Sequence, residues 1–293
     1  MDLYDAIEYR KSTRRFSTKK LKPQLMNNVK AICKEFTCID GYSNIKAHII
    51  ERGHMIHLLL GGNCKVKSPH YIVLSTDEDD DYLMNAGYCC EDIILRLTTI
   101  GVGTCILESK LSDKQMNEIL KEEQMYVDLC DSHENSDEFR LDIFEKEEKV
   151  QERAVILIAL GYPEKGEELF RTSEDTSERK PLKNISKGFQ KDIQWIEILE
   201  RTGLAPSYKN LQPWFFLKGK DSDYIHIYEK NQNKKYQELS TISMGAMLCN
   251  LDIICKRYNI DIKFQKLGKK DRFGKKYFIS TKVSYNPKEV ENN

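Results

Sequence analysis

The chain has 293 residues, and its 46 lysines and arginines balance its 46 aspartates and glutamates, so the formal net charge is zero. Hydrophobic residues make up 40% and aromatic residues 10% of the sequence, a composition that excludes a disordered chain. The balanced charge gives no global basic field. We therefore expect no nucleic-acid partner and no membrane partner, and any anion site must be built locally.

Three further features predict a cytoplasmic location. The first residues, MDLYDAIEYRKSTRRF, place no apolar run after their charges, which is not the pattern of a signal peptide. No segment approaches the roughly 20 apolar residues that cross a bilayer. Nine cysteines are scattered without a CxxC pair or metal-ligand spacing, so we expect them to be reduced and mostly buried.

The first elements expected in chain order are two helices. Leu3 and Ile7 form an apolar i, i+4 pair in a short N-terminal helix. A cationic turn, RKSTRRFSTKKLKP, follows it, and Pro23 begins a second helix with one buried face. The segments HMIHLLLG (54–61) and HYIVLS (70–75) are interpreted as strands.

A long, mostly buried helix is expected next, in NAGYCCEDIILRLTTIGVGTCIL (85–107). It ends at Gly101 and continues into a short extended piece. Residues 111–149 become acidic and broken, which predicts a helix plus a solvated insertion. The segment RAVILIALGYP (153–163) is the most apolar strand, and it suits the middle of a sheet buried on both faces.

The second part of the chain repeats the pattern of the first. SMGAMLCNLDIICKRYNIDIKF overlays NAGYCCEDIILRLTTIGVGTCI with Gly245 on Gly87. ILERTGLAPSYKNLQPWFF overlays ICKEFTCIDGYSNIKAHII with Asn210 on Asn44, and YIHIY at 224 overlays MIHLL at 55. The overlays need a few short indels, including loss of the strand equivalent to HYIVLS. Three overlays in the same order predict an internal duplication.

The duplication predicts two copies of one architecture. The first copy spans residues 1–165, with the acidic insertion at about 121–150, and the second, shorter copy spans residues 166–293. We expect the copies to pack about a pseudo-two-fold axis, like the subunits of a fused dimer. The chain is therefore predicted to be a monomeric pseudo-dimer.

Two motifs are divided between the copies. In RKSTRRF of the first copy, Arg10, Ser12 and Arg14 alternate, so their side chains face the same way if the segment is extended. Two guanidiniums and a hydroxyl suit a phosphate; the alternative is a solvated basic turn. The second copy carries LAPSYKNLQPWFF, with the side-chain amides of Asn210 and Gln212 but no matching arginine-rich turn. Its WFF run is expected to lie in the core.

Five segments together resemble the nitroreductase family of flavoproteins: AIEYRKSTRRF, APSYKNLQPWFF, NAGYCCEDIILRLTTIGVGTCIL, RAVILIALGYP and ERKPLKNI. The pair RxSxR and APSxxNxQPW is fairly specific. In ordinary members both motifs lie in the N-terminal third of one subunit, and two subunits form two flavin mononucleotide (FMN) sites at their interface. The resemblance implies an α+β, nitroreductase-like fold, with both copies packed around central mixed sheets flanked by helices. Because each motif survives in a different copy, it also implies one flavin site.

The resemblance also implies roles for the flavin ligands. Arg10 and Ser12 would hold the FMN phosphate, with Lys11 between them. Arg14 would approach the ring edge that becomes negative on reduction. Arg179 would add a second cation at the phosphate; the alternative is a surface arginine. Residues of both copies would line the flavin, namely Ile106, Leu107 and Glu108 from the first and Pro206, Ser207 and Asn210 from the second.

The sequence departs from the family pattern at two places. Ser109 stands where ordinary members often have a glycine beside flavin N5. The Lys or Asn that usually grips the pyrimidine edge has three candidates, Asn63, Lys65 and Lys67.

Other catalytic and metal-binding patterns are not expected. No GxGxxG or GxSxG motif is complete. His54, His57 and His70 have no carboxylate or cysteine at ligand spacing, so they are interpreted as core or edge histidines. Cys89 and Cys90 lie in a buried helix without an adjacent base, so neither is expected to be a nucleophile.

The leading functional hypothesis is an FMN-dependent oxidoreductase of nitroreductase type. NAD(P)H would deliver hydride to flavin N5, and a small-molecule electron acceptor such as a quinone or a nitroaromatic would take the electrons at the same face. No catalytic side chain beyond the flavin ligands is expected. The alternatives are a non-catalytic flavin-binding or flavin-sequestering protein, and an interaction module that binds no flavin.

Overall fold

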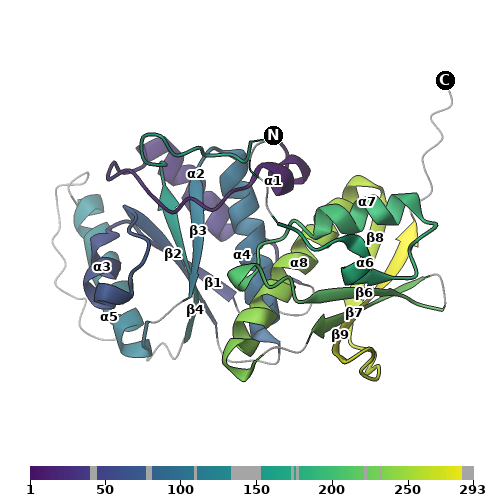
Figure 1. Cartoon of the computed structure of the whole chain (residues 1–293). Coiled ribbons are helices and arrows are strands. Elements are labelled where there is room, and N and C mark those ends of the chain that lie inside the picture. The colour runs from purple at the N-terminus through teal and green to yellow at the C-terminus, as the bar shows by residue number, and fades with distance from the viewer. Residues whose placement is uncertain are drawn as a thin grey trace.

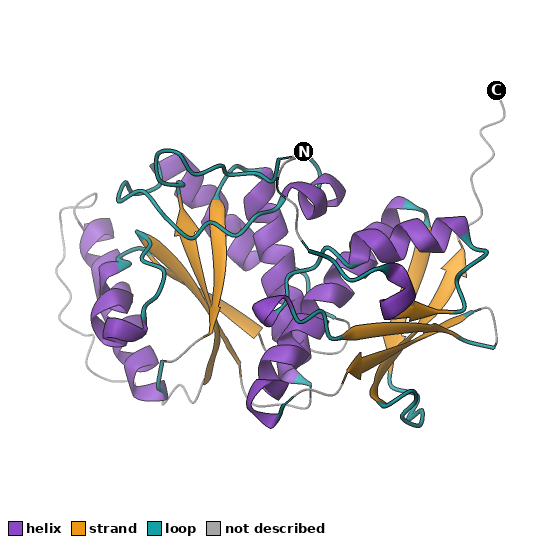
Figure 2. Cartoon of the chain, in the orientation of Figure 1, coloured by secondary structure: helices purple, strands orange, loops and turns teal. Residues whose placement is uncertain are grey.

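The computed structural model describes residues 1–39, 45–76, 81–108, 111–132, 153–172, 175, 178–220, 223–230 and 233–285. Two sheets lie on either side of two long helices that cross at the centre, α4 (Tyr82–Thr99) and α8 (Gln237–Arg257) (Figure 1). Shorter helices cover the sheets (Figure 2). The predicted α+β class is confirmed.

The first sheet is antiparallel throughout and has the order β1-β2-β4-β3. Its strands are β1 (Ile45–Ile50), β2 (His70–Thr76), β3 (Gly103–Glu108) and β4 (Arg153–Gly161). On β4, Ile156, Ile158 and Leu160 pack with α2 (Pro23–Lys34) and α4, whereas Leu157 and Ala159 pack with α3 (His54–Leu60) and α5 (Asp113–Ser132). The predicted central strand, buried on both faces, is confirmed.

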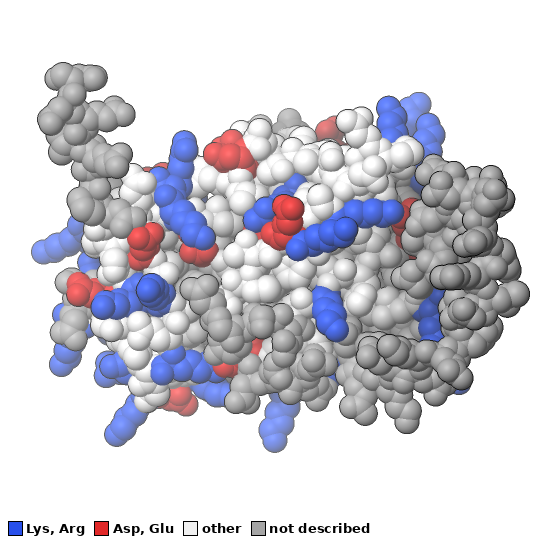
Figure 3. Space-filling view, turned by 180° about the vertical axis from the view of Figure 1, so that it is seen from behind, with Lys and Arg blue, Asp and Glu red and all other residues white. Residues whose placement is uncertain are grey.

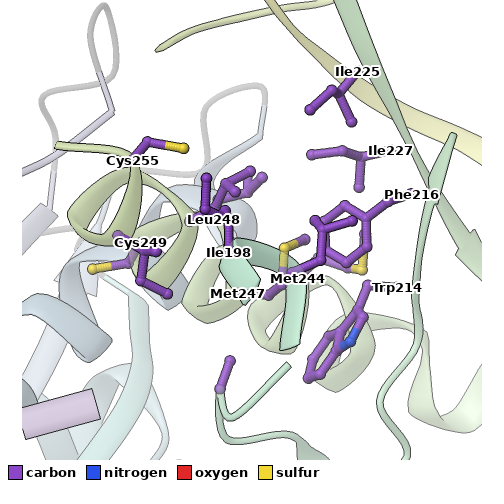
Figure 4. Close-up of a cluster of buried hydrophobic side chains, with 14 of the residues drawn as sticks. Ile198, Trp214, Phe216, Ile225, Ile227, Met244, Met247, Leu248, Cys249 and Cys255 are labelled. Carbon is purple, nitrogen blue, oxygen red and sulfur yellow. The ribbon is translucent and has the colours of Figure 1, made fainter. Parts of the chain in front are cut away.

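The second sheet has the order β5-β6-β7-β9-β8. Its strands are β5 (Ser186–Lys187), β6 (Trp214–Lys218), β7 (Tyr224–Lys230), β8 (Ile260–Gln265) and β9 (Lys275–Tyr285). Only β5 and β6 are parallel. Trp214 and Phe216 are fully buried against Ile198 of α7 (Ile193–Thr202) and Met244 of α8 (Figure 4). The aromatic run belongs to the core, as predicted.

Apart from β5, the strand order of the second sheet repeats that of the first. The order β1-β2-β4-β3 corresponds to β6-β7-β9-β8, and all of these neighbours are antiparallel. Both long helices occupy the same place in the chain order, because α4 lies between β2 and β3 and α8 lies between β7 and β8. Two similar half-molecules therefore flank the central helix pair.

The segment His54–Leu60 forms the helix α3, so its interpretation as a strand was wrong. Ile56 and Leu60, one helical turn apart, are buried, whereas Leu58 is 76% exposed. In a strand all three would share one face, but period alone does not separate a helix from a strand in so short an apolar run.

Because residues 54–60 form a helix, one of the three sequence overlays is wrong. YIHIY forms the strand β7, which cannot match the helical segment MIHLL. By sheet position β7 is the counterpart of β2, so the strand equivalent to HYIVLS is not lost. Among the described residues, the second half has no helix matching α3 between β6 and β7, and none matching α5 between β8 and β9.

The two central helices cross where Gly87 faces Gly245. A Cβ atom on Gly87 would lie 2.0 Å from the carbonyl oxygen of Ile242, and one on Gly245 would lie 1.9 Å from that of Met84. The contact is reciprocal. The same offset relates Gly245 to Gly87 and Ile242 to Met84 (245 − 87 = 158 and 242 − 84 = 158), so each half makes the same glycine-to-carbonyl contact with the other. Reciprocal contacts are typical of an isologous, two-fold interface. The division at residues 165 and 166 stays a prediction.

One segment, Lys234–Arg257, is long and apolar enough to cross a membrane by length and composition alone. Within this fold, 67% of its apolar window is buried, and α8 packs against α4 and the second sheet. It is the core helix of the second half.

Charged side chains of both signs are interspersed over the described part of the face shown in Figure 3. Of the predicted acidic insertion, residues 121–132 belong to α5, and residues 133–150 lie outside the described part of the chain. Asn44, the sequence partner of Asn210, and Ser109 also lie outside it.

Candidate functional site

The arginine turn is an extended segment between β3 and the connector, which we define as residues 162–185. It leaves α1 (Leu3–Tyr9), whose N-cap Asp2 accepts a hydrogen bond from the Asp5 amide. Ser12 then pairs with Thr104 of β3, and Arg10 pairs with Phe170 of the connector. The turn therefore adds backbone to the outer edge of the first sheet.

Arg10 is not a solvated basic residue, because only 6% of it is exposed. Its Nη1 lies 3.5 Å from the Ser12 hydroxyl, so these two side chains converge as predicted. Arg14 is exposed. Burial raises the pKa of Cys105 in β3, and the positive charges of Arg14 and Arg10 both oppose that rise. Lys11 points to Asp175, with 3.0 Å between Nζ and Oδ2.

A buried carboxyl group faces Arg10 from the central helix. Oε1 of Glu91 lies 3.9 Å from Arg10 Nε, and Glu91 is 1% exposed. The Asn250 amide of α8, oriented to satisfy both of its neighbours, donates to this oxygen over 3.3 Å and accepts from the Ala205 amide. Oε2 of Glu91 has no hydrogen-bond partner within the described part of the chain. The carboxyl thus lies where both halves meet.

Glu91 titrates near neutral pH. Burial raises the pKa of Glu91 to about 7, Arg10 and Arg179 oppose the rise, and Asp92 adds to it. A carboxyl with such a pKa can be neutral beside an anionic ligand, whereas an ionised one would repel it.

Two connector arginines join Arg10 to form a cationic cluster, which we call the arginine cluster: Arg10, Arg171 and Arg179. Burial, Arg171 and Arg10 lower the pKa of Arg179 to about 10, and Glu91 opposes them. Burial and Arg10 likewise lower the pKa of Arg171, against Asp175 and Glu8. The arginines therefore lie close enough to one another for their positive charges to interact, an arrangement that suits an anion.

Sequence reasoning missed Arg171. It belongs to no motif, and only the fold brings it to the turn, through the hydrogen bond from the Arg171 amide to the Tyr9 carbonyl (2.8 Å). The sequence signal for Arg171 is its position eight residues before Arg179, which is itself predicted to supply a cation to the phosphate.

Arg179 links the cluster to the stretch LAPSYKN. Its Nη1 donates to Asn210 Oδ1 and its Nη2 to the Leu204 carbonyl, both over 2.9 Å, while the buried Nε has no partner in the described residues. Asn210 Nδ2 in turn donates to the Glu178 carbonyl (2.8 Å). Asn210 therefore fixes the position of Arg179.

Gln212, the second amide, also holds the connector. Its Oε1 accepts from the Lys180 amide (2.8 Å) and its Nε2 donates to Asn210 Oδ1 (3.1 Å). Lys209, Asn210 and Gln212 all have positive φ angles, of 48°, 56° and 44°. Left-handed residues that are not glycine cost free energy and cluster at functional sites.

The remaining loop residues fasten the stretch to α8. Ser207 Oγ accepts from the Gln212 amide (3.0 Å), and Ser243 Oγ of α8 accepts from the Tyr208 amide (3.1 Å). Tyr208 also packs on Tyr236, with 5.4 Å between ring centroids. Pro206 is half-buried beside them. The loop therefore lies along the first turns of α8.

A cleft of about 560 Å³ opens at those same turns. Glu108, at the end of β3, is the one predicted site residue in its wall; Ile106 and Leu107 precede it on the strand and are half-buried. The wall combines apolar side chains with a few charged ones: Leu83, Leu111, Ala154, Val155, Leu239 and Ile242, together with Arg153, Lys234, Lys235 and Glu238. Charged side chains thus form a large part of the wall.

No group of His, Cys, Asp or Glu within the described ranges could hold a metal ion. His57 bonds to the Tyr71 hydroxyl (3.0 Å), and His70 Nε2 accepts from the Leu21 amide (3.0 Å). Both side chains are engaged in hydrogen bonds within the fold.

These features define an α+β protein in which a cluster of arginines and a buried carboxyl lie where two similar halves meet. The sequence matches the family described as "Putative TM nitroreductase" over residues 2–130 and 139–255, and the chain belongs to this family. The predicted family resemblance is confirmed. Among curated protein sequences, none matches this chain.

Solved structures of nitroreductase family proteins are similar to this chain to different extents. A "putative nitroreductase" from Thermotoga maritima is 19% identical, with 98% of this chain and 95% of that chain covered and a TM-score of 0.57. An FMN-dependent nitroreductase from Clostridium difficile is 16% identical, with 57% and 90% covered and a TM-score of 0.40. A nitroreductase family protein from Clostridium difficile is 12% identical, with 63% and 96% covered and a TM-score of 0.43. Only the first supports a shared fold over the whole chain.

Glu91 should make the apoprotein less stable as the pH rises. Because its folded pKa lies above its ordinary value of 4.5, its contribution is fully present below pH 4.5 and is lost as the pH rises to about 7. The free energy of unfolding, compared with that of Glu91→Gln, should fall by about 1–3 kcal/mol over this window. Urea unfolding of both proteins at several pH values measures the difference. Parallel pH profiles would contradict the assignment.

Proposed function

We propose that this protein is an FMN-dependent oxidoreductase with one flavin site, built from both halves. The observation that carries the proposal is a pair of connections between the halves. One runs from Arg10 through Glu91 and Asn250 to Ala205. The other runs from the arginine cluster, through Arg179, to Asn210. Together these connections join the two motifs that the family resemblance associates with FMN, although the motifs are about 200 residues apart in the sequence.

The residues present fit the FMN phosphate. The positive charges of the three clustered arginines act on one another, the Ser12 hydroxyl lies beside Arg10, and the buried Nε of Arg179 lacks a partner in the described residues. An anion at this place could accept a hydrogen bond from Arg179 Nε, the buried donor that has no partner in the described residues. We assign the phosphate to Arg10, Ser12, Arg171 and Arg179, with Lys11 near by.

The ring of the flavin is assigned to the region between the end of β3 and the LAPSYKN loop. Ile106, Leu107 and Glu108 would contact it from the first half, and Pro206, Ser207 and Asn210 from the second. The cleft beside Glu108 offers the volume for a second small molecule.

When bound, FMN would supply two-electron chemistry, taking hydride from NAD(P)H and passing electrons to a quinone, a nitroaromatic or a similar conjugated acceptor. The protein contributes position and charge. The arginine cluster would hold the phosphate, the exposed Arg14 would offer a cation to the ring, and Glu91 would stay protonated beside the anion.

The colour of the purified protein tests this function. We expect a yellow protein whose absorbance near 450 nm bleaches under anaerobic conditions on addition of NADH or NADPH and returns when a quinone is added. A yellow protein that neither cofactor bleaches would favour flavin binding without catalysis. A colourless protein that fails to take up added FMN would overturn the proposal.

Asn210→Gly should weaken FMN binding about tenfold, since one hydrogen bond to a charged group contributes about 1.5–3 kcal/mol and part of the loss can be regained by water. Glycine tolerates the left-handed backbone of this position, so the change removes the side chain that holds Arg179 without adding strain. Fluorescence titration of the apoprotein with FMN measures the affinity. Asn259→Gly is the matched control, because Asn259 has a φ of 55° at the far end of α8. Equal effects of the two variants would contradict the role of Asn210.

A further inference from the structure

Two thiols lie against each other outside the candidate flavin site. Cys38 Sγ and Cys89 Sγ are 3.1 Å apart, although 51 residues separate them in the sequence. Cys89 is fully buried in α4, whereas Cys38, in the segment after α2, is partly exposed. Neither cysteine belongs to a CxxC motif, so this pair could not be predicted from local sequence spacing.

The backbone on both sides of Cys38 is fastened to α4. Asn85 Oδ1 accepts from the Ile39 amide (3.1 Å), and Asp92 Oδ2 accepts from the Thr37 amide (2.9 Å). Asn85, Cys89 and Asp92 lie at i, i+4 and i+7, on one stripe of the helix. The thiols are therefore held together by the fold, and a bond between them requires little backbone movement.

The environment gives the two thiols different roles. Cys38 and burial raise the pKa of Cys89 far above its usual value, so Cys89 keeps its proton and donates it toward Cys38. That hydrogen bond lowers the pKa of Cys38, against the opposing effects of burial and Asp92. Cys38 is thus the accessible thiol and the one that ionises more readily, and Cys89 is the buried thiol beside it.

We propose that Cys38 and Cys89 form a redox-active dithiol, which a small-molecule disulfide oxidises to an intramolecular disulfide bond. The Cys38 thiolate would attack one sulfur of glutathione disulfide, form a mixed disulfide and release one glutathione. Cys89 would then attack Cys38 Sγ, release the second glutathione and give up its proton to it. Two protein thiols are oxidised and one external disulfide is reduced. The proposal does not depend on flavin binding.

The test uses the full-length protein, reduced with dithiothreitol, desalted and exposed to glutathione disulfide. Free thiols are then blocked, and peptides are mapped by mass spectrometry without reduction. We expect a peptide pair linked through Cys38 and Cys89, the loss of two free thiols per chain, and recovery of both on reduction. Cys89→Ser should stop at a glutathione adduct on Cys38, and Cys38→Ser should leave Cys89 unmodified.

The matched control is Cys33→Ser, because Cys33 is a nearby buried cysteine of α2 whose pKa burial raises to about 12. This variant should form the same linked peptide as the unmodified sequence. The proposal would be overturned if the wild-type protein kept the Cys38 and Cys89 thiols free, accumulated a stable glutathione adduct, or formed its disulfide between other cysteines. These outcomes are measured on the wild-type protein, so a folding defect in a variant cannot obscure them.

Discussion

Arg10→Ala should weaken FMN binding by about 2–4 kcal/mol, a dissociation constant about 30- to 1000-fold higher. Arg10 is buried, contacts Ser12 and Glu91, and contributes to the electrostatic environment of both Arg171 and Arg179. Its removal would take one cation from the phosphate and would leave Glu91 without its nearest positive charge. Titration of the apoprotein with FMN, followed by flavin fluorescence, measures the loss.

Arg15→Ala is the control in the same turn. The Arg15 side chain is 69% exposed and pairs with Glu167 at the surface, so its removal should leave FMN affinity unchanged. If the two variants bound FMN equally well while both stayed folded, the arginine turn would not be the phosphate site.

Gly245→Ala should lower the free energy of unfolding by about 3 kcal/mol or more, since overpacking against a backbone that cannot move is costly. The added Cβ would lie 1.9 Å from the Met84 carbonyl oxygen and 3.0 Å from Gly87 Cα, so α4 and α8 would have to separate. The expected sign is opposite to that of an ordinary helical Gly→Ala change, which stabilises by about 1 kcal/mol. Gly87→Ala should act in the same way, because the contact is reciprocal.

Gly62→Ala is the matched control for this crossing. A Cβ on Gly62 would meet nothing within 4 Å, so the stability should change by less than about 0.5 kcal/mol. Chemical unfolding of the three variants compares them directly. A Gly245→Ala protein as stable as the Gly62→Ala protein would contradict the close crossing of the two halves.

The repeat at the helix crossing could be predicted because it depends on local pattern. Gly245 overlays Gly87 in the sequence, and the structure brings these two glycines together. The strand β4 was likewise evident from its continuous apolar run. Both features depend on burial, and the pattern of apolar and small residues along the sequence predicts which positions are buried.

The features that could not be predicted from the sequence depend on the folded structure, mostly on contacts between distant segments. Seven apolar-rich residues in α3 fit either a strand or a helix until the burial of Ile56 and Leu60 decides between them. Arg171 joins the arginine cluster only because the connector pairs with the N-terminal turn. Asn210 could be named from its motif, but its bond to Arg179 requires the folded loop. The flavin roles of the named residues stay predictions.

The central claim is that the two halves share one flavin site. By the helix overlay, the position equivalent to Glu91 in the second half is Cys249 (91 + 158 = 249), so the buried carboxyl of the candidate site is not repeated. The most direct measurement is the molar ratio of flavin to chain, with FMN released by denaturation and quantified by absorbance after saturation and removal of free ligand. The account predicts one FMN per chain, and a ratio near two would contradict it.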